Sequence, residues 1–186
     1  NWLLLTIIAG AAAAVFNTLL RRDLQDGQDP TAYAWWYELI RLAFFGLLIP
    51  FFPFFDFSWI HLGLLILLGL VEFAAVYVYM KMHSASELSL SMIILQLRCV
   101  YVPIFAFFAL GEQLTSLEWL GIMLIVTGAI VAVRPRSLTI DRALTYTILA
   151  GLLTAISSIM IKVTSNFASI PVVAFAFSLP AVVLFP

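Results

Sequence analysis

The hydrophobic positions of this chain gather into long apolar runs, which short polar or proline-containing turns separate. A run of about 18 or more apolar residues predicts a membrane-spanning helix, because about 20 residues at a rise of 1.5 Å match the thickness of the hydrocarbon layer. The pattern predicts the start of a seventh helix near residue 171, after six complete helices over residues 2–20, 31–52, 59–80, 87–110, 117–133 and 143–162.

The composition changes this picture from a set of helices to a class of protein. The 186 residues are 64% hydrophobic and 10% charged, whereas a typical soluble domain has about 25% charged residues. We therefore expect an all-α integral membrane protein, built as a helical bundle. The net charge of −1 supplies no basic field for a nucleic acid. A single cysteine and two distant histidines form no disulfide framework or zinc-binding spacing, so no metal or cofactor is expected.

Four segments occur in an order and spacing that a known family shares. They are a small-residue stretch at 83–86, a proline within the apolar segment 102–105, Leu-Gly-Glu at 110–112 and a glycine-containing helix over 121–128. The chain resembles the EamA repeat of the drug/metabolite transporter superfamily, and the resemblance runs from Leu3 to Pro186. It implies that the protein moves small metabolites, such as amino acids or related solutes.

An internal repeat predicts the architecture. Residues 6–21 align without gaps on residues 147–162, an offset of 141 residues, and the same offset carries Pro30 onto Pro171. A repeat of this length holds five helices. An odd number of helices turns the second copy upside down in the membrane, which is a recurring plan of secondary transporters. We expect two inverted EamA repeats and about ten helices in the whole protein, of which this chain carries about seven.

The expected first repeat covers residues 1–136, and the start of the second covers residues 137–186. The chain has no initiator methionine and stops inside an apolar run, so we expect a piece of a longer protein. Basic residues cluster in the turns after the first, third and fifth helices, and the positive-inside rule places such turns in the cytoplasm. The family resemblance implies the reverse orientation, with both termini cytoplasmic, so the orientation stays open.

Four charged side chains fall within the predicted helices. At 1.5 Å per residue, Glu72 and Arg98 lie roughly 17 and 21 Å from the turn near Ser84, and Glu38 shares a helix face with Arg41. Each charge would cost roughly 2.5–3.5 kcal/mol at the centre of a helix in lipid. Two alternatives follow. Glu38–Arg41 and Glu72–Arg98 are ion pairs that lock the helices, or these side chains line a cavity and contact a substrate or a coupled proton.

Arg98 is the leading candidate for binding, because it is the deepest charge and Pro103 follows it. Pro103 removes a backbone hydrogen bond to the carbonyl of Cys99, which predicts a helix break next to Arg98. A guanidinium suits a carboxylate or phosphate, which it binds through two parallel hydrogen bonds. Glu72 is the candidate titrating group, since burial favours the neutral carboxyl unless Arg98 holds it ionised.

Other polar and aromatic side chains have two interpretations each. Gln96 makes either an interhelical hydrogen bond or a substrate contact. Tyr79 shares a helix face with Glu72 and is a candidate lining residue, with packing as the alternative. Asn17 is expected to pack between helices. The aromatic residues 35–37 are expected in the belt at the membrane interface.

The expected substrate-binding set is Glu38, Arg41, Glu72, Tyr79, Gln96 and Arg98. With the family resemblance, it predicts a secondary active transporter that binds a small polar, amino-acid-like solute in a midplane cavity between the repeats and moves it by alternating access. The alternative is a membrane-embedded scaffold or enzyme whose charged layer is structural. No catalytic set such as Ser–His, paired aspartates or HExxH is recognised, so catalysis is not expected.

The expected partners are a small-molecule substrate, a proton as the candidate coupled ion, and the lipid bilayer. No nucleic acid is expected. Either one copy or a homodimer is compatible with the sequence, since an inverted repeat can form a pathway within one chain. The expected location is the plasma membrane or a bacterial inner membrane, which the chain crosses several times.

Overall fold

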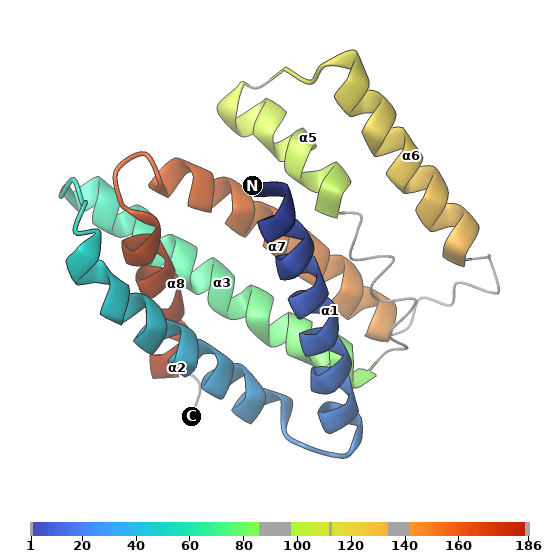
Figure 1. Ribbon diagram of the computed structural model, residues 1–186, viewed down its shortest axis with the longest axis horizontal. Helices are drawn as coiled ribbons and strands as arrows, with labels where there is room; N and C mark the ends of the chain where they lie inside the picture. Colours follow the sequence, from blue (N-terminus) through green and yellow to red (C-terminus); the bar gives the residue numbers. More distant parts are fainter. Residues whose placement is uncertain (1, 86–97, 112, 134–141, 185–186) are drawn as a thin grey trace.

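The computed structural model describes residues 2–85, 98–111, 113–133 and 142–184, and within these ranges the chain is helical with no β-strand (Figure 1). Its elements follow the predicted apolar runs: α1 (Trp2–Gln25), α2 (Pro30–Leu48), the 3₁₀ turn η1 (Ile49–Phe51), α3 (Trp59–Ala85), α5 (Arg98–Leu110), α6 (Ser116–Val133), α7 (Arg142–Thr164) and α8 (Ile170–Leu184). The all-α fold class predicted from the pattern is therefore confirmed. The first part of the helix expected over 87–110 lies outside the described residues.

Helix ends follow local capping chemistry. The turn between α1 and α2 contains Gly27, whose φ of +91° favours glycine. The Asp29 carboxylate then accepts a hydrogen bond from Thr31 N at 2.9 Å, and Pro30 occupies the first helical position. Helix α6 begins with a capping box. The Thr115 hydroxyl accepts from Glu118 N, while the Glu118 carboxylate accepts from Thr115 N at 2.7 Å.

Helix α3 is the centre of the bundle. It packs against α7 along one side and against α8 and α2 along another, while α5 lies against α7 and α6 lies beyond it (Figure 1). The core between α3 and α8 is formed by Leu65 and Leu68 with Val173, Ala174 and Phe177. Most side chains of α1 and α6 are exposed, as suits apolar helices whose outer faces meet lipid rather than water.

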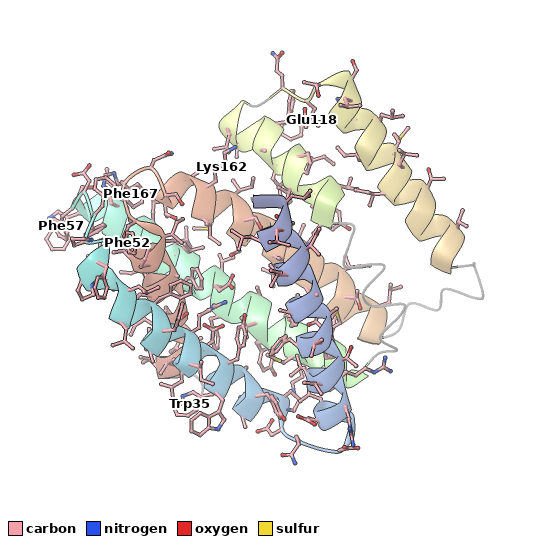
Figure 2. All side chains as sticks on the ribbon, in the orientation of Figure 1. Trp35, Phe52, Phe57, Glu118, Lys162 and Phe167 are labelled. Carbon is pink, nitrogen blue, oxygen red and sulfur yellow. The ribbon has the colours of Figure 1, made fainter. Side chains whose placement is uncertain are left out.

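The turns at one end of the bundle hold α2–α3 to α7–α8. Asp56 N donates to Phe167 O at 2.8 Å, and Ser169 N donates to Phe54 O at the same distance. The His61 ring stacks on Phe167 with the ring centres 4.0 Å apart. Figure 2 shows the labelled aromatic side chains of these two turns at that end of the bundle. These bonds fix the lengthwise register of α3 against α7 and α8.

Gly69 allows α3 and α8 to approach closely. A Cβ at this position would lie 2.5 Å from Pro180 Cγ, 2.9 Å from Pro180 Cδ and 3.0 Å from Ala176 O. Pro180 lies inside α8, where it has no N–H to offer the Ala176 carbonyl. The contact is therefore made by a rigid ring and backbone on both sides, and neither can give way cheaply.

We predict that Gly69→Ala lowers the thermal stability of the protein. Overpacking of this kind costs about 1–3 kcal/mol, because the new methyl group meets the Pro180 ring. The matched control is Gly63→Ala on the same helix, where a Cβ would meet nothing within 4 Å. The control should be neutral or stabilising by up to about 1 kcal/mol, since alanine favours a helix. Thermal unfolding of the two purified variants in one detergent tests this, and equal melting temperatures would contradict it.

Candidate functional site

A cavity of about 300 Å³ lies in the bundle between five helices. Helices α1, α2, α3, α5 and α7 each contribute at least one polar side chain to its wall. These side chains are Asn17, Tyr37, Arg41, Glu72, Tyr79, Arg98 and Thr154. Apolar residues of α1 and α3 complete the wall, so the cavity presents polar side chains beside apolar ones within an apolar bundle.

Arg41 is the hub of the charged groups. Its Nη2 lies 2.7 Å from Glu38 Oε2 and 3.3 Å from Glu72 Oε1, and its Nε donates to Ser178 Oγ at 2.9 Å. The guanidinium carbon lies 4.2 Å from the ring centre of Phe177. One side chain of α2 therefore joins α3 and α8. A planar guanidinium with five N–H donors is suited to this task, whereas a lysine ammonium is not.

The two glutamates of this cluster differ in their surroundings. Both oxygens of Glu72 are satisfied, because Oε1 faces Arg41 and Oε2 accepts from Ser157 Oγ at 2.6 Å. Glu38 is fully buried, and its only ionic partner among the described residues is Arg41. Neither of its oxygens has a hydrogen-bond partner there, although Oε2 lies 2.7 Å from Arg41 Nη2. Buried polar atoms are nearly always hydrogen-bonded, so Glu38 is an exception to that rule.

The structure brings together most of the residues that the sequence singled out. Glu38, Arg41 and Glu72 form one cluster, and Tyr79 and Arg98 line the cavity beside it. The Glu38–Arg41 pair is present as expected. In place of the expected pair with Arg98, Glu72 pairs with Arg41, because α3 and α2 face each other at this level.

The structure bears in different ways on three other expectations, which concern Gln96, Pro103 and Tyr37. Gln96 lies outside the described residues. Helix α5 does not end at Pro103 but continues through it to Leu110, so the described part of the helix shows no break there. Tyr37, expected in the aromatic belt, also lines the cavity, and its ring centre lies 5.1 Å from the Arg41 guanidinium.

Sequence reasoning missed two hydroxyl groups that complete the site. Ser157 and Ser178 are both buried, and each binds one of the charged residues directly. Asn17 was expected to pack between helices; its side-chain oxygen accepts from the Tyr79 hydroxyl at 2.6 Å, and it also lines the cavity. The available signal was the occurrence of serines in otherwise apolar helices, where they must find partners.

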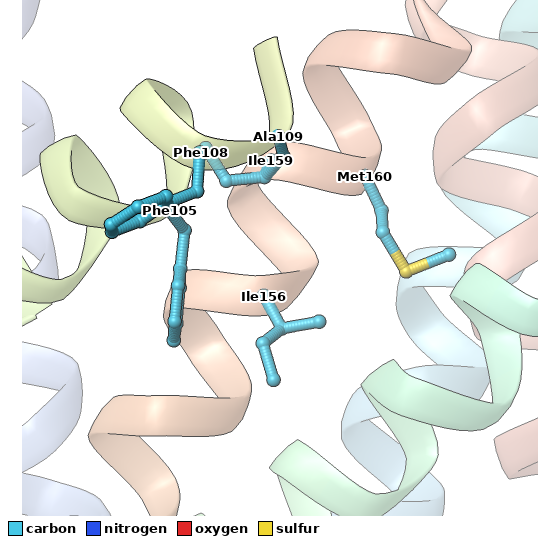
Figure 3. A pocket seen from close by; sticks show the side chains of 6 residues that line it. All are labelled: Phe105, Phe108, Ala109, Ile156, Ile159 and Met160. Atoms are coloured by element: carbon cyan, nitrogen blue, oxygen red, sulfur yellow. The ribbon is translucent and has the colours of Figure 1, made fainter. Parts of the chain in front are cut away.

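A second pocket, of about 470 Å³, lies between α5 and α7 (Figure 3). It is lined by Phe105, Phe108 and Ala109 from α5 and by Ile156, Ile159 and Met160 from α7. With no polar group to orient a ligand, it offers no chemistry for recognition. Among the described residues, no group of three or more His, Cys, Asp or Glu side chains could hold a metal ion.

The fold and the site together define a class of protein. Four of the described helices are long and apolar enough to cross a membrane, and they surround a charged chamber. This is an integral membrane protein with a polar site in its core. A model of the EamA-like transporter family matches residues 1–134, and the chain belongs to that family. The resemblance seen in the sequence is thus confirmed, and with it a transporter-like function in a membrane. A search of curated proteins finds no match to the chain.

We predict that Ser157→Ala destabilises the protein, because it leaves Glu72 Oε2 without its donor. A hydrogen bond to a charged group is worth about 1.5–3 kcal/mol. The matched control is the neighbouring Ser158→Ala, since Ser158 is exposed and its one hydrogen bond to a described residue is to Thr154 O of its own helix. Thermal unfolding in detergent should separate the two variants by several degrees. A Ser157 variant as stable as the Ser158 variant would show that Glu72 does not depend on α7.

Proposed function

We propose that this protein is a secondary active transporter that carries a small polar, zwitterionic metabolite through the cavity by alternating access. The solute binds at the level of Arg41, Glu72 and Arg98, between the helices of the two proposed repeats. The observation that carries the proposal is the composition of the cavity wall. It combines polar and charged side chains with apolar ones, and helices from both proposed repeats contribute to it.

The 141-residue offset relates side chains on opposite sides of this site. It pairs Ala13 with Thr154, and both line the cavity. It also pairs Tyr37 with Ser178, and both contact Arg41. Helix α8 begins 140 residues after α2, at residue 170 against 30. Equivalent positions that converge on one chamber support a site on the symmetry axis between two repeats, where such transporters bind their substrates.

The charges of the cavity support the substrate class. Arg98 is exposed and makes no ion pair with another described residue, so its guanidinium is available to a carboxylate. Glu72 keeps part of its surface open to the cavity and provides the opposite charge for an ammonium group. A volume of about 300 Å³ fits a small solute. These features favour an amino-acid-like molecule over a bulky apolar one.

A structural function for the charged cluster is the alternative. Arg41 ties α2 to α3 and α8, which by itself stabilises the bundle. In that case the protein would be a scaffold or an enzyme, and its cavity would bind no transported solute. Ligand binding separates the alternatives, because a purely structural cluster has no reason to discriminate among solutes.

The first experiment is a ligand-induced thermal shift on the purified full-length protein. The panel contains amino acids, organic cations, sugar phosphates and nucleotides, each at two pH values. A ligand that binds only the folded state raises the melting temperature, so we expect stabilisation by amino acids. Uptake of the stabilising solute into proteoliposomes then tests transport itself. A flat response to the panel together with no solute flux would overturn the proposal.

We predict that Arg98→Gln weakens the binding of a carboxylate ligand about tenfold to a hundredfold. The loss of charge-assisted hydrogen bonds costs about 1.5–3 kcal/mol, and 1.4 kcal/mol is a factor of ten in Kd. Because Arg98 is exposed, the variant should keep its melting temperature without ligand. Arg22→Gln, an exposed position at the end of α1, is the control. Unchanged affinity in the Arg98 variant would remove Arg98 from the site.

A further inference from the structure

Asn17 is the polar side chain that α1 contributes to the cavity. The other described residues of α1 in the cavity wall are Ala13 and Phe16, and most side chains of this helix are exposed. Asn17 is half-buried. A side-chain amide has one acceptor oxygen and two N–H donors, and polar groups at membrane depth are costly unless they find partners. The hydrogen bonds of this amide therefore indicate its function.

The Tyr79 hydroxyl fixes the orientation of the Asn17 amide. It donates to Asn17 Oδ1 at 2.6 Å and has no other hydrogen-bond acceptor within the part of the chain that the structure describes. If the amide were turned over, its NH2 group would face the phenol oxygen, and the phenol hydrogen would have no acceptor in that part. The amide oxygen is thus held on Tyr79, while both N–H groups have no acceptor among the described residues.

Arg98 adds further donors near this amide. Its guanidinium lies within electrostatic reach of the Tyr79 hydroxyl, and both Arg98 and Asn17 line the cavity. Arg98 has five N–H donors and no acceptor, and it forms no ion pair with another described residue. The oxygens of Glu72 accept instead from Ser157 and Arg41. The part of the cavity near Tyr79 therefore has more N–H donors than acceptors.

A ligand group with two acceptor oxygens matches this excess of donors. We propose that Asn17 and Arg98 form a carboxylate subsite of the cavity, and that Tyr79 is a positioning residue that keeps the amide N–H groups turned toward it. One carboxylate oxygen accepts from the guanidinium, which supplies the charge, and the other accepts from the Asn17 amide. The subsite rests on the transport function proposed above, and it narrows the solutes to molecules with a free carboxylate.

The same geometry makes the subsite selective against a neutral amide. A carboxamide has one oxygen in place of two, and its own NH2 group would face the N–H groups of Asn17 or Arg98. A site whose donors are left unpaired by the wrong ligand rejects that ligand strongly. We therefore expect discrimination between a carboxylate and the corresponding carboxamide, which have nearly the same shape.

Thermal shifts with acetate and acetamide test the subsite without the transported solute. Acetate is a lone carboxylate, and acetamide is its neutral counterpart. The purified full-length protein is titrated with each at constant ionic strength, with sodium chloride replacing sodium acetate. A ligand of the folded state raises the melting temperature, so we expect acetate to stabilise the protein and acetamide to bind about tenfold more weakly or less. No shift with acetate, or equal shifts with acetate and chloride, would overturn the proposal.

Asn17→Leu removes both N–H groups at nearly the same side-chain size. The Kd for acetate should rise about tenfold, because a hydrogen bond to a charged group is lost. The matched control is Thr18→Val, since Thr18 is exposed and its hydroxyl bonds to Ala14 O of its own helix. The control should keep the wild-type affinity. An Asn17 variant that binds acetate as tightly as the control would remove Asn17 from the subsite.

Tyr79→Phe separates positioning from packing. It keeps the ring, whose centre lies 4.6 Å from that of His83, and removes only the hydrogen that holds Asn17 Oδ1. The freed amide can turn its oxygen toward the cavity, so the preference for acetate over acetamide should fall several-fold. A purely structural role would lower the melting temperature without changing this preference. Tyr77→Phe is the control, because Tyr77 is exposed on the same helix and does not line the cavity.

The outcomes distinguish the subsite from the transport function. Acetate binding that depends on Asn17, without flux of any solute, would contradict transport and leave the subsite in place. Flux of a carboxylate solute that is unchanged in Asn17→Leu would overturn the subsite and leave transport in place. An unchanged acetate preference in Tyr79→Phe would overturn the positioning role of Tyr79.

Discussion

The burial of Arg41 among apolar helices is the constraint on which the site depends. A guanidinium in a bundle of this kind requires several partners, because its charge has little water to stabilise it. The chain supplies them from three directions, with carboxyl groups from α2 and α3, a hydroxyl group from α8 and the face of Phe177. To reach Arg41, each partner must lie at one particular position along the axis of its own helix. The positions of α3 and α8 are thereby tied to a single side chain of α2.

Packing contacts away from Arg41 keep its partner residues at the correct positions along α3 and α8. The close contact of Gly69 with Pro180 sets the separation of α3 and α8 just beside Glu72 and Ser178. At one end of the bundle, the hydrogen bonds between the two turns fix how far α3 can slide. A charged network tolerates errors of only a few tenths of an ångström in its hydrogen bonds. The rigid contacts of glycine, proline and backbone therefore serve the polar site as well as the stability of the fold.

Much of the fold could be predicted from the sequence, because apolar length alone locates helices in a membrane protein. The charged layer was also visible, since Glu38, Arg41, Glu72 and Arg98 interrupt apolar runs. The sequence did not show which of these charged residues form ion pairs with each other. Counting residues from a turn gives the depth of a side chain but not its direction around the helix axis, so Glu72 was paired with Arg98 on depth alone.

The serines of the site show a second limit of sequence reasoning. A single hydroxyl in an apolar helix can bond to its own backbone, as Ser158 does, or reach another helix, as Ser157 does. The two residues are adjacent and chemically identical. They differ only in the direction in which their side chains point from α7, and that direction depends on how α7 packs against α3. The repeat alignment helps to decide which of the two serines faces the site. The 141-residue offset places Ser157 at the position that corresponds to Phe16, which lines the cavity.

The strong and weak contacts of the cluster are distributed unevenly among its helices. The ion pairs of the cluster lie between side chains of α2 and α3, whereas its contacts to α7 and α8 are made by two serine hydroxyls and the ring of Phe177. Under the 141-residue offset, Arg41 corresponds to Val182 and Glu38 to Leu179, so neither of these two corresponding positions carries a charge. Interhelical hydrogen bonds in membranes average about 0.6 kcal/mol, while breaking a buried ion pair costs about 3–5 kcal/mol. Within the cluster, the stronger contacts therefore lie between α2 and α3, and the weaker ones join these helices to α7 and α8. Those weaker contacts are backed by the close approach of Gly69 to Pro180 and by the hydrogen bonds between the two turns, which hold α3 against α8 and α7.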